Sequence, residues 1–193
     1  ARAGGTSNAG VAPVPDAVIE IWQADEQGRY AHPSDPRGSN VGFKGFGRMG
    51  TGTDAQSRFI FDTIKPGSVD GAQAPHVNVV VFMRGMPTHA FTRLYFSDEA
   101  AANARDPVLA TVPIERRPTL IATRDTNAAA TIYRFDIHMQ GPDETVFFVS
   151  LSAEPTPAFE AAWEDLPPAE LIPGYHDFEE GDFRDKDALA LTQ

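Results

Sequence analysis

The sequence predicts an all-β domain with a few short helices, and three observations carry that prediction. Segments rich in β-branched and aromatic residues recur through residues 8–150 and are separated by turn-forming residues. Several of these segments alternate apolar and polar residues with the period of two that a strand requires. The chain has 193 residues, which is enough to bury a core without disulfide bonds or metal ions. Together these observations favour a β-sandwich or a barrel.

Two segments show the clearest strand patterns. Residues 17–24 form one strand, with Ile19 and Ile21 on the face opposite Glu20 and Trp22. Residues 76–83 are apolar on both faces, which is typical of a central strand that is covered on both sides. The second segment is therefore expected in the middle of a sheet.

The other predicted strands are shorter or more polar. Residues 46–53 and 58–63 are expected to pair as a hairpin, with the turn at residues 54–57. Further strands are predicted at residues 93–96, 119–123, 132–138 and 144–151.

One helix is predicted between two strands. Ser97 is placed to cap its start, and Asp98 and Glu99 lie in the first turn, where the helix dipole favours acidic side chains. The alanine-rich residues 100–104 propagate the helix, and the Asp-Pro pair at 106–107 is expected to end it.

The last part of the chain differs from the rest. Residues 151–193 are rich in proline and hold eleven acidic but only two basic residues. We therefore expect two regions, a β-sandwich domain at 8–150 and an acidic C-terminal tail at 151–193. Within the tail, residues 157–166 are predicted to form a short helix with Phe159 and Trp163 on one face.

The composition argues against several classes of protein and of functional site. The net charge of −11 argues against a nucleic-acid binder, since such proteins carry basic patches. No apolar run approaches the roughly 20 residues that span a bilayer, so no membrane partner is expected. The chain has no cysteine, which excludes thiolate zinc sites, iron–sulfur clusters and cysteine nucleophiles. A chain without cysteine also fits a cytoplasmic protein, which is the location we expect.

Residues 76–78 hold the one arrangement that suggests a metal site. Positions i and i+2 of a strand point to the same face, so two histidines there would offer both imidazoles to one metal ion. This chain has His76 in the first position but Asn78 in the second, and an amide is a poor ligand for a transition metal. His76 is therefore either a hydrogen-bonded strand histidine or the remnant of a metal site that has lost a ligand.

Tyr30 and Arg84 are two further candidates. Tyr30 lies in a polar loop after the first strand, where it either anchors the loop or supplies a phenolate to a ferric ion. Arg84 follows the apolar strand, and an arginine in that place can meet a carboxylate with its planar fork. That carboxylate belongs either to an internal ion pair or to a ligand.

Seven short segments occur in a specific order. They are DAVIEIWQAD at 16–25, FGR at 46–48, TIKPG at 63–67, APHVN at 74–78, TRLYF at 92–96 followed by DEA at 98–100, YRFDI at 133–137 and ETVFF at 144–148. In this order they resemble the intradiol ring-cleavage dioxygenases, over residues 10–149. The resemblance implies an intradiol-dioxygenase-like β-sandwich.

The resemblance also implies where an iron site would lie. Members of this family hold a non-haem Fe(III) ion between two tyrosines and two histidines, bind a catecholate to it and open the ring between the hydroxyl groups. Matching the motifs places these ligands at Tyr30, Val69, His76 and Asn78, and places Gln73 where catalytic chains have an arginine. Two of the four ligands are missing, so we expect a degenerate site with no metal and no cofactor in this chain.

This pattern of loss is similar to the non-catalytic chains of the family, which pair with a catalytic chain that has all four ligands. The resemblance therefore implies a subunit of a hetero-oligomeric oxidoreductase, with Fe(III) in the partner chain and a small aromatic carboxylate as substrate. No catalytic residue is then expected in this chain. Arg84 is the expected substrate-binding residue, because the matching arginine reaches toward the substrate carboxylate in the partner's pocket.

Two other functions stay open at this point. One is a stand-alone β-sandwich that binds or scaffolds other molecules, which predicts a stable monomer. The other is an active enzyme with a rearranged site that recruits His32, Tyr175 or His176, which predicts metal in the isolated chain.

Overall fold

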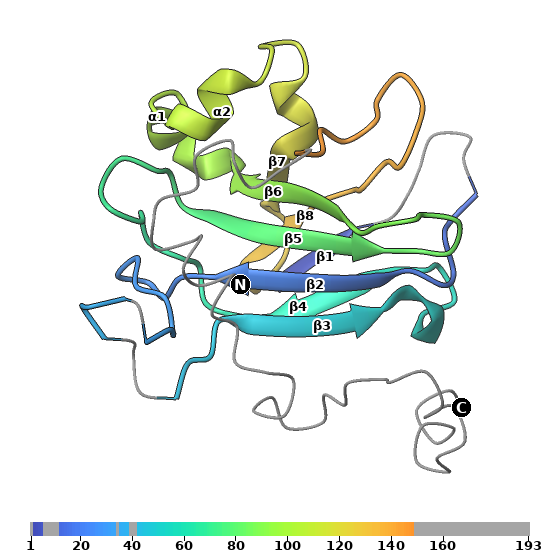
Figure 1. The fold of residues 1–193 in the computed structure, drawn as a ribbon, viewed down its shortest axis with the longest axis horizontal. Coiled ribbons are helices and arrows are strands. Elements are labelled where there is room, and N and C mark those ends of the chain that lie inside the picture. The colour runs from blue at the N-terminus through green and yellow to red at the C-terminus, as the bar shows by residue number, and fades with distance from the viewer. Residues whose placement is uncertain (1, 6–11, 34, 39–41, 149–193) are drawn as a thin grey trace.

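A curled sheet of eight strands makes up most of the protein in its computed structural model (Figure 1). The structure describes residues 2–5, 12–33, 35–38 and 42–148. The strands lie side by side in the order β3-β2-β5-β6-β7-β8-β1-β4, which confirms the predicted all-β class. Their bounds are β1 Arg2–Gly5, β2 Val18–Gln23, β3 Phe46–Gly50, β4 Phe59–Asp62, β5 His76–Phe82, β6 Ala90–Phe96, β7 Ile121–Asp125 and β8 Ile132–Arg134.

The sheet divides into two halves that face each other. In the first half β2 lies between β3 and β5, β6 follows, and all of these pairs are antiparallel. A short parallel pairing of β6 with β7 leads into the second half. There β7 pairs with β8, which runs parallel to β1, and β1 is antiparallel to β4.

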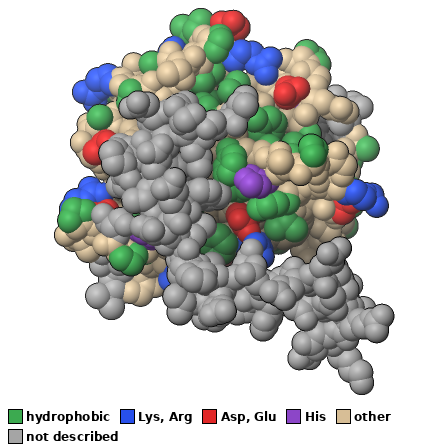
Figure 2. Space-filling model, in the orientation of Figure 1, with side chains coloured by type: hydrophobic (Ala, Val, Ile, Leu, Met, Phe, Trp, Pro, Cys, Tyr) green, Lys and Arg blue, Asp and Glu red, His purple; other side chains and the backbone are tan. Residues whose placement is uncertain are grey.

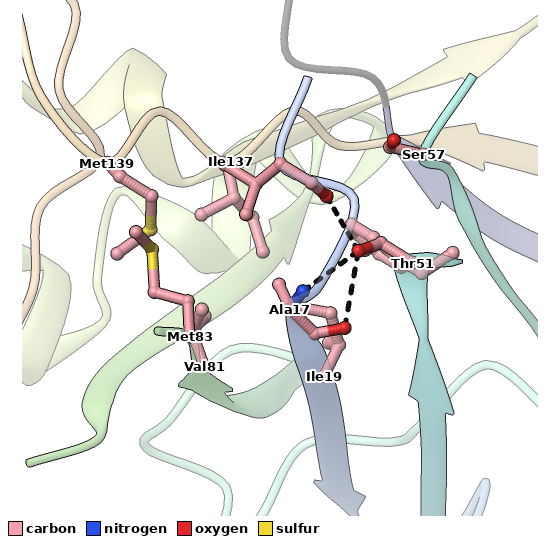
Figure 3. A pocket seen from close by; sticks show the side chains of 10 residues that line it. Ala17, Ile19, Thr51, Ser57, Val81, Met83, Ile137 and Met139 are labelled. Carbon is pink, nitrogen blue, oxygen red and sulfur yellow. Dashed lines mark hydrogen bonds between the residues drawn. The ribbon is translucent and has the colours of Figure 1, made fainter. Parts of the chain in front are cut away.

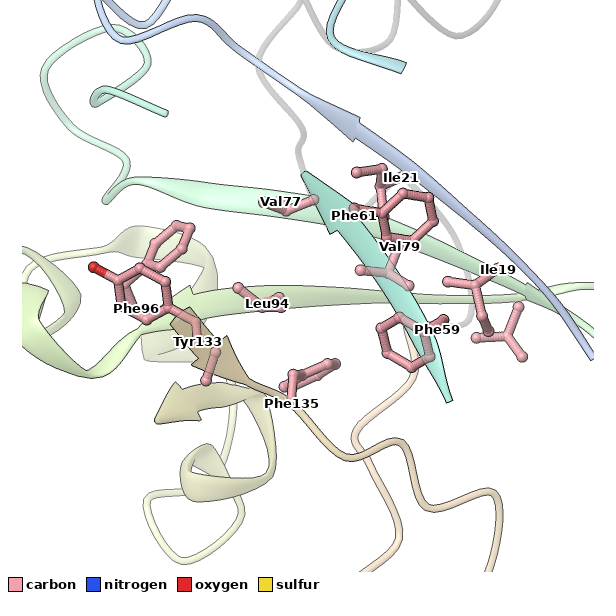
Figure 4. Close-up of a cluster of buried hydrophobic side chains, with 12 residues drawn as sticks. Ile19, Ile21, Phe59, Phe61, Val77, Val79, Leu94, Phe96, Tyr133 and Phe135 are labelled. Atoms are coloured by element: carbon pink, nitrogen blue, oxygen red, sulfur yellow. The ribbon is translucent and has the colours of Figure 1, made fainter. Parts of the chain in front are cut away.

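The core lies between the two halves. Phe59 and Phe61 of β4 face Ile19, Ile21 and Val79 of the opposite half (Figure 4). Side chains from six strands and their ends therefore share one apolar interior, as a sandwich requires. The complete cluster consists of Ile19, Ile21, Phe59, Phe61, Val77, Val79, Val81, Leu94, Phe96, Ala122, Tyr133 and Phe135.

The central position predicted for residues 76–83 is confirmed. β5 pairs with β2 on one side and with β6 on the other, and its residues 76–81 are all buried. Val77, Val79 and Val81 point into the core. His76 and Asn78 therefore point to the outer face of this half of the sheet.

Two short α-helices, α1 Ala100–Asn103 and α2 Pro107–Thr111, follow β6 and lie above β6 and β7 in Figure 1. The expected cap at Ser97 is wrong, since this residue begins a 3₁₀ turn and its Oγ accepts a hydrogen bond from the Arg124 N–H. The expected stop at Asp106 is also the start of α2. The Asp106 carboxylate accepts the Leu109 N–H at 2.7 Å, and proline fills the first helical position.

The predicted hairpin of residues 46–53 and 58–63 is wrong in its pairing. β3 and β4 form at these places but lie at opposite ends of the strand order. After β3 the chain forms the 3₁₀ turn Thr51–Thr53 and then crosses to the second half of the sheet. Gly47 explains the crossing, because a Cβ there would lie only 3.0 Å from the Phe61 ring. The missing side chain lets β4 pack across β3 instead of beside it.

The last predicted strands are shorter than expected. β8 ends at Arg134, and within the described part of residues 144–151 only Phe148 forms a bridge, with Phe91. The tail at 151–193 and its predicted helix at 157–166 lie outside the described residues, so the domain boundary stays a prediction. In the described part of the chain, every helix is too short or too polar to cross a membrane.

The shared core makes a direct prediction about stability. Leu94 of β6 is 3% exposed and packs between the two halves, so Leu94→Ala is expected to lower the free energy of unfolding by about 2–5 kcal/mol. Ile114 is 76% exposed, and Ile114→Ala serves as the matched control, with an expected change within about 0.5 kcal/mol. Urea denaturation followed by tryptophan fluorescence measures both. Equal effects of the two substitutions would contradict the assignment of the core.

Candidate functional site

The four positions predicted for a degenerate metal site come together in space. His76 and Asn78 lie two residues apart on β5 and share its outer face. The Asn78 amide donates to the Tyr30 hydroxyl at 3.2 Å. Val69, in the loop before β5, packs with Tyr30 in one buried cluster. All four side chains are buried, so the site is closed to solvent.

Tyr30 is held in place by the loop that follows β2. The Trp22 ring stacks on the Tyr30 ring, with 6.3 Å between centroids and 6° between planes. The Tyr30 backbone N–H donates to the Asp35 carboxylate at 2.9 Å. Gly28 has a φ of +75°, and a Cβ there would lie 1.9 Å from the Ser68 carbonyl oxygen. A glycine at this position lets the loop lie against the segment that carries Val69.

His76 keeps the protonation pattern of a metal ligand. Its Nδ1 lies 2.8 Å from the Ala74 carbonyl oxygen, so Nδ1 carries the proton and Nε2 carries a lone pair. The Nε2 atom is buried and has no hydrogen-bond partner among the residues that the structure describes. Burial, helped by the positive charge of Arg93, lowers the pKa of His76 to about 3. The imidazole is therefore neutral, with a buried lone pair on Nε2.

Arg93 is a central residue of the site that sequence reasoning missed. It lies on β6 directly opposite Asn78 in the strand register. Its Nε donates to Asn78 Oδ1 at 3.1 Å, and its Nη1 donates to Gln73 Oε1 at 2.8 Å. Only 6% of the residue is exposed. The sequence offered only a weak signal, which is that a charged residue in a predicted strand needs polar partners when that strand packs beside a fully buried one.

Asp106 links the segments around the site through its carboxylate. The Tyr95 hydroxyl donates to Asp106 Oδ1 at 3.1 Å, and the Ala74 N–H donates to Asp106 Oδ2 at 2.8 Å. Together with the Leu109 N–H at the start of α2, these donors satisfy a carboxylate that is completely buried. Asp106 thus joins α2, β6 and the loop that holds His76.

Arg84 lies far from these residues. It sits in the turn between β5 and β6, its side chain is 85% exposed, and its Nε donates to the Asp16 carboxylate at 2.9 Å. It follows Asn78 by six residues, which corresponds to about 20 Å along an extended chain. The structure therefore does not bring Arg84 together with the other predicted site residues.

Aromatic side chains flank the turn between β5 and β6, which also holds Arg84. Phe82 is one of the large hydrophobic residues that are exposed in the described part of the chain. The His89 ring lies 5.3 Å from the Phe82 ring and 4.4 Å from the Phe91 ring. Figure 2 shows that hydrophobic side chains and a histidine gather on the face of the molecule that is turned toward the viewer. An exposed apolar patch beside a charged residue is typical of a protein–protein contact.

A shallow pocket opens at the end of the sandwich near Met83 (Figure 3). The Thr51 hydroxyl donates to the Val14 carbonyl and accepts the Ala17 N–H, so its hydrogen bonds are used within the fold. The lining holds no charged side chain and offers no group for acid–base chemistry. It consists of Val14, Ala17, Ile19, Thr51, Ser57, Phe59, Val81, Met83, Ile137 and Met139.

Comparison with known proteins identifies the family. The Dioxygenase_C family profile, described as Dioxygenase, matches residues 3–141. A protocatechuate 3,4-dioxygenase alpha chain from Burkholderia cepacia is 58% identical over 136 residues, which cover 70% of this chain and 68% of that protein. The chain belongs to the intradiol ring-cleavage dioxygenases. The resemblance of the seven ordered segments is thereby confirmed.

Other intradiol dioxygenase subunits and structures are also similar. A protocatechuate 3,4-dioxygenase alpha chain from Pseudomonas putida is 46% identical over 140 residues, covering 70% of this chain and 68% of that protein. A beta chain of the same name from Burkholderia cepacia is 33% identical over 145 residues, covering 69% and 60%. Among solved structures, an intradiol ring-cleavage dioxygenase from Tetranychus urticae has a TM-score of 0.48 and 19% identity, covering 70% and 78%.

The residues of this chain do not fit the iron of the intradiol dioxygenases. Val69 has no donor atom, and the Asn78 amide is engaged by Tyr30 and Arg93. Burial raises the pKa of Tyr30, which keeps the hydroxyl protonated. His76 alone retains a ligand's geometry, and no cluster of three potential His, Cys, Asp or Glu ligands occurs within the described residues. No catalytic step therefore runs through an iron ion at this site.

The loop that positions Tyr30 predicts a specific dependence of stability on pH. The Arg37 side chain, with the N–H groups of Tyr30 and Arg37, lowers the pKa of Asp35 from 3.8 to about 2. A carboxyl whose pKa is lower in the folded state contributes stability above the unfolded pKa and loses it as the pH falls toward the folded pKa. Asp35→Asn should therefore cost less stability at low pH. The difference from wild type should shrink by about 2 kcal/mol between about pH 5 and pH 2.

Urea titrations of wild type and Asp35→Asn across this pH range measure the difference. A difference that stays constant with pH would show that the Asp35 carboxylate does not stabilise the loop through its charge.

Proposed function

We propose that this chain is the non-catalytic alpha subunit of protocatechuate 3,4-dioxygenase. The assembled enzyme would convert protocatechuate and O₂ into 3-carboxy-cis,cis-muconate. The observation that carries the proposal is the buried guanidinium of Arg93, held by Asn78 and Gln73 at the place where catalytic chains of the family bind iron. A chain with this site cannot supply the metal, and its sequence is 58% and 46% identical to two alpha chains.

The proposal assigns the Fe(III) to a catalytic beta chain. A beta chain from Burkholderia cepacia is 33% identical to this chain, which supports a partner of related fold. The exposed aromatic patch around Phe82 and His89 supports a protein contact next to Arg84. We place the complex in the cytoplasm, without nucleic-acid or membrane partners.

Arg84 is proposed to bind the substrate carboxylate in the pocket of the beta chain. Its ion pair with Asp16 is largely exposed, and exposed pairs contribute little stability, so the guanidinium is free to change partners. Its position at the far end of β5 directs it away from the degenerate site of its own chain. The substrate class follows from this residue, because a planar guanidinium binds a carboxylate through two parallel hydrogen bonds.

Iron content and assembly test the proposed function. The chain purified alone is expected to be colourless and free of iron, since its site lacks two donors. Co-expressed with a beta chain, it is expected to purify as a complex that holds one iron ion for each beta chain and cleaves protocatechuate. Visible absorption, metal analysis and light scattering measure these properties. A stable monomer that does not form a complex with the beta chain would favour a stand-alone binding protein. An isolated chain that is coloured and holds iron would contradict the proposal.

Steady-state kinetics of the complex test Arg84. Arg84→Ala is expected to raise KM for protocatechuate by about tenfold to a hundredfold, the range for losing a hydrogen bond to a charged group. The value of kcat should change much less, because the substituted group does not touch the iron. Arg134→Ala, which removes an exposed arginine from β8, is the matched control and should leave KM unchanged. Unaltered kinetics of Arg84→Ala would remove this residue from the substrate site.

A further inference from the structure

We infer that the Arg93 guanidinium replaces the metal ion as the cation of the degenerate site. In this role the guanidinium donates hydrogen bonds to the amide oxygens of Asn78 and Gln73. Its charge also prevents a metal ion from binding. This effect of the Arg93 charge on metal binding is separate from the loss of two ligands. Restoring the two ligands would therefore not restore metal binding while Arg93 is present.

The first support is the arrangement of acceptors around Arg93. Asn78 and Gln73 both turn their amide oxygens, not their NH₂ groups, toward the guanidinium. Arg93 also hydrogen-bonds the Tyr95 hydroxyl, which in turn donates to the buried Asp106 carboxylate. Oxygen lone pairs that converge on one positive charge are what a metal site provides, and here a guanidinium with five N–H donors receives them.

The second support is independent of Arg93's hydrogen bonds. His76 still carries a lone pair on Nε2, and within the described part of the chain this buried atom has no hydrogen-bond partner. Buried polar atoms are nearly always satisfied, and among the described residues Trp22 Nε1 and Asn103 Oδ1 share this state with His76 Nε2. Of these three atoms, the imidazole nitrogen is the one whose lone pair suits a transition metal. The positive charge of Arg93 acts on this imidazole and would repel a metal ion that approached its lone pair.

The electrostatic consequence is strong because the site is buried. Two cations repel each other much more in a protein interior than in water, and a ferric ion carries three charges. The guanidinium of an arginine is a permanent cation. It therefore excludes a metal ion permanently, in a way that a neutral side chain would not.

Metal binding by the full chain tests the inference. A double variant, Val69→Tyr with Asn78→His, restores both missing donors and keeps Arg93. A triple variant adds Arg93→Gln, which removes the charge, and a control triple variant adds Arg93→Lys, which keeps it. Each protein is loaded with Fe(II) sulfate under argon, exposed to air and gel-filtered. Iron content and the visible absorption of tyrosinate bound to Fe(III) are then measured.

The variant with Arg93→Gln is expected to retain at least about tenfold more iron than the other two, a factor that corresponds to about 1.4 kcal/mol. Equal retention by the double variant or by the Arg93→Lys variant would overturn the inference. So would a folded Arg93→Gln variant that binds no iron.

The size of tyrosine at position 69 requires a second set of variants, because Val69 is 3% exposed and closely packed. Val69→Asp supplies a smaller donor, and the same three combinations are made with it. Circular dichroism with and without iron reports folding. Arg93→Gln variants that fold only when iron is present support the exchange of one cation for another. If they stay unfolded in the presence of iron while the double variants fold, a metal ion cannot take the place of Arg93 and the inference is wrong.

The inference rests on the proposed function only in treating the site as iron-free. Its failure would leave the assembly with a beta chain and the effect of Arg84 on KM unaffected, so the two are tested separately.

Discussion

The central strand β5 has to be covered on both faces, and this constraint determines where the polar cluster forms. Three valines on one face pack between the two halves of the sheet. The other face begins with His76 and Asn78, whose polar atoms need partners once they are buried. The loops after β2 and before β5, together with β6, supply most of those partners. The same strand thus builds the apolar core on one side and a polar network on the other.

The period of a strand explains how much of the site the sequence could predict. His76 and Asn78 share a face because they are two residues apart, whatever the rest of the chain does. Arg93 was missed because its place depends on the register between β5 and β6, which sets it opposite Asn78. The pattern of one strand contains no information on that register.

The same limit explains the errors in the fold. Residues 46–50 and 59–62 were recognised as strands, but their pairing depends on how Phe61 packs over Gly47 across the sandwich. The helix α2 was missed because an Asp-Pro pair ends one helix and starts the next with the same residues. The fold class and the central strand, which follow from local alternation and composition, could be predicted. The ordered segments added the family, which no single pattern could have identified.

Arg93 has a consequence for how the family can evolve. A chain with the present site cannot return to metal binding by one substitution at a time. Losing Arg93 alone leaves the oxygen atoms of Asn78 and Gln73 without their buried donor, and replacing Asn78 alone removes an acceptor from a buried cation. Each single reversal lowers stability before any iron can bind. This loss of stability opposes any stepwise return to metal binding, so the two kinds of subunit stay distinct once they have diverged.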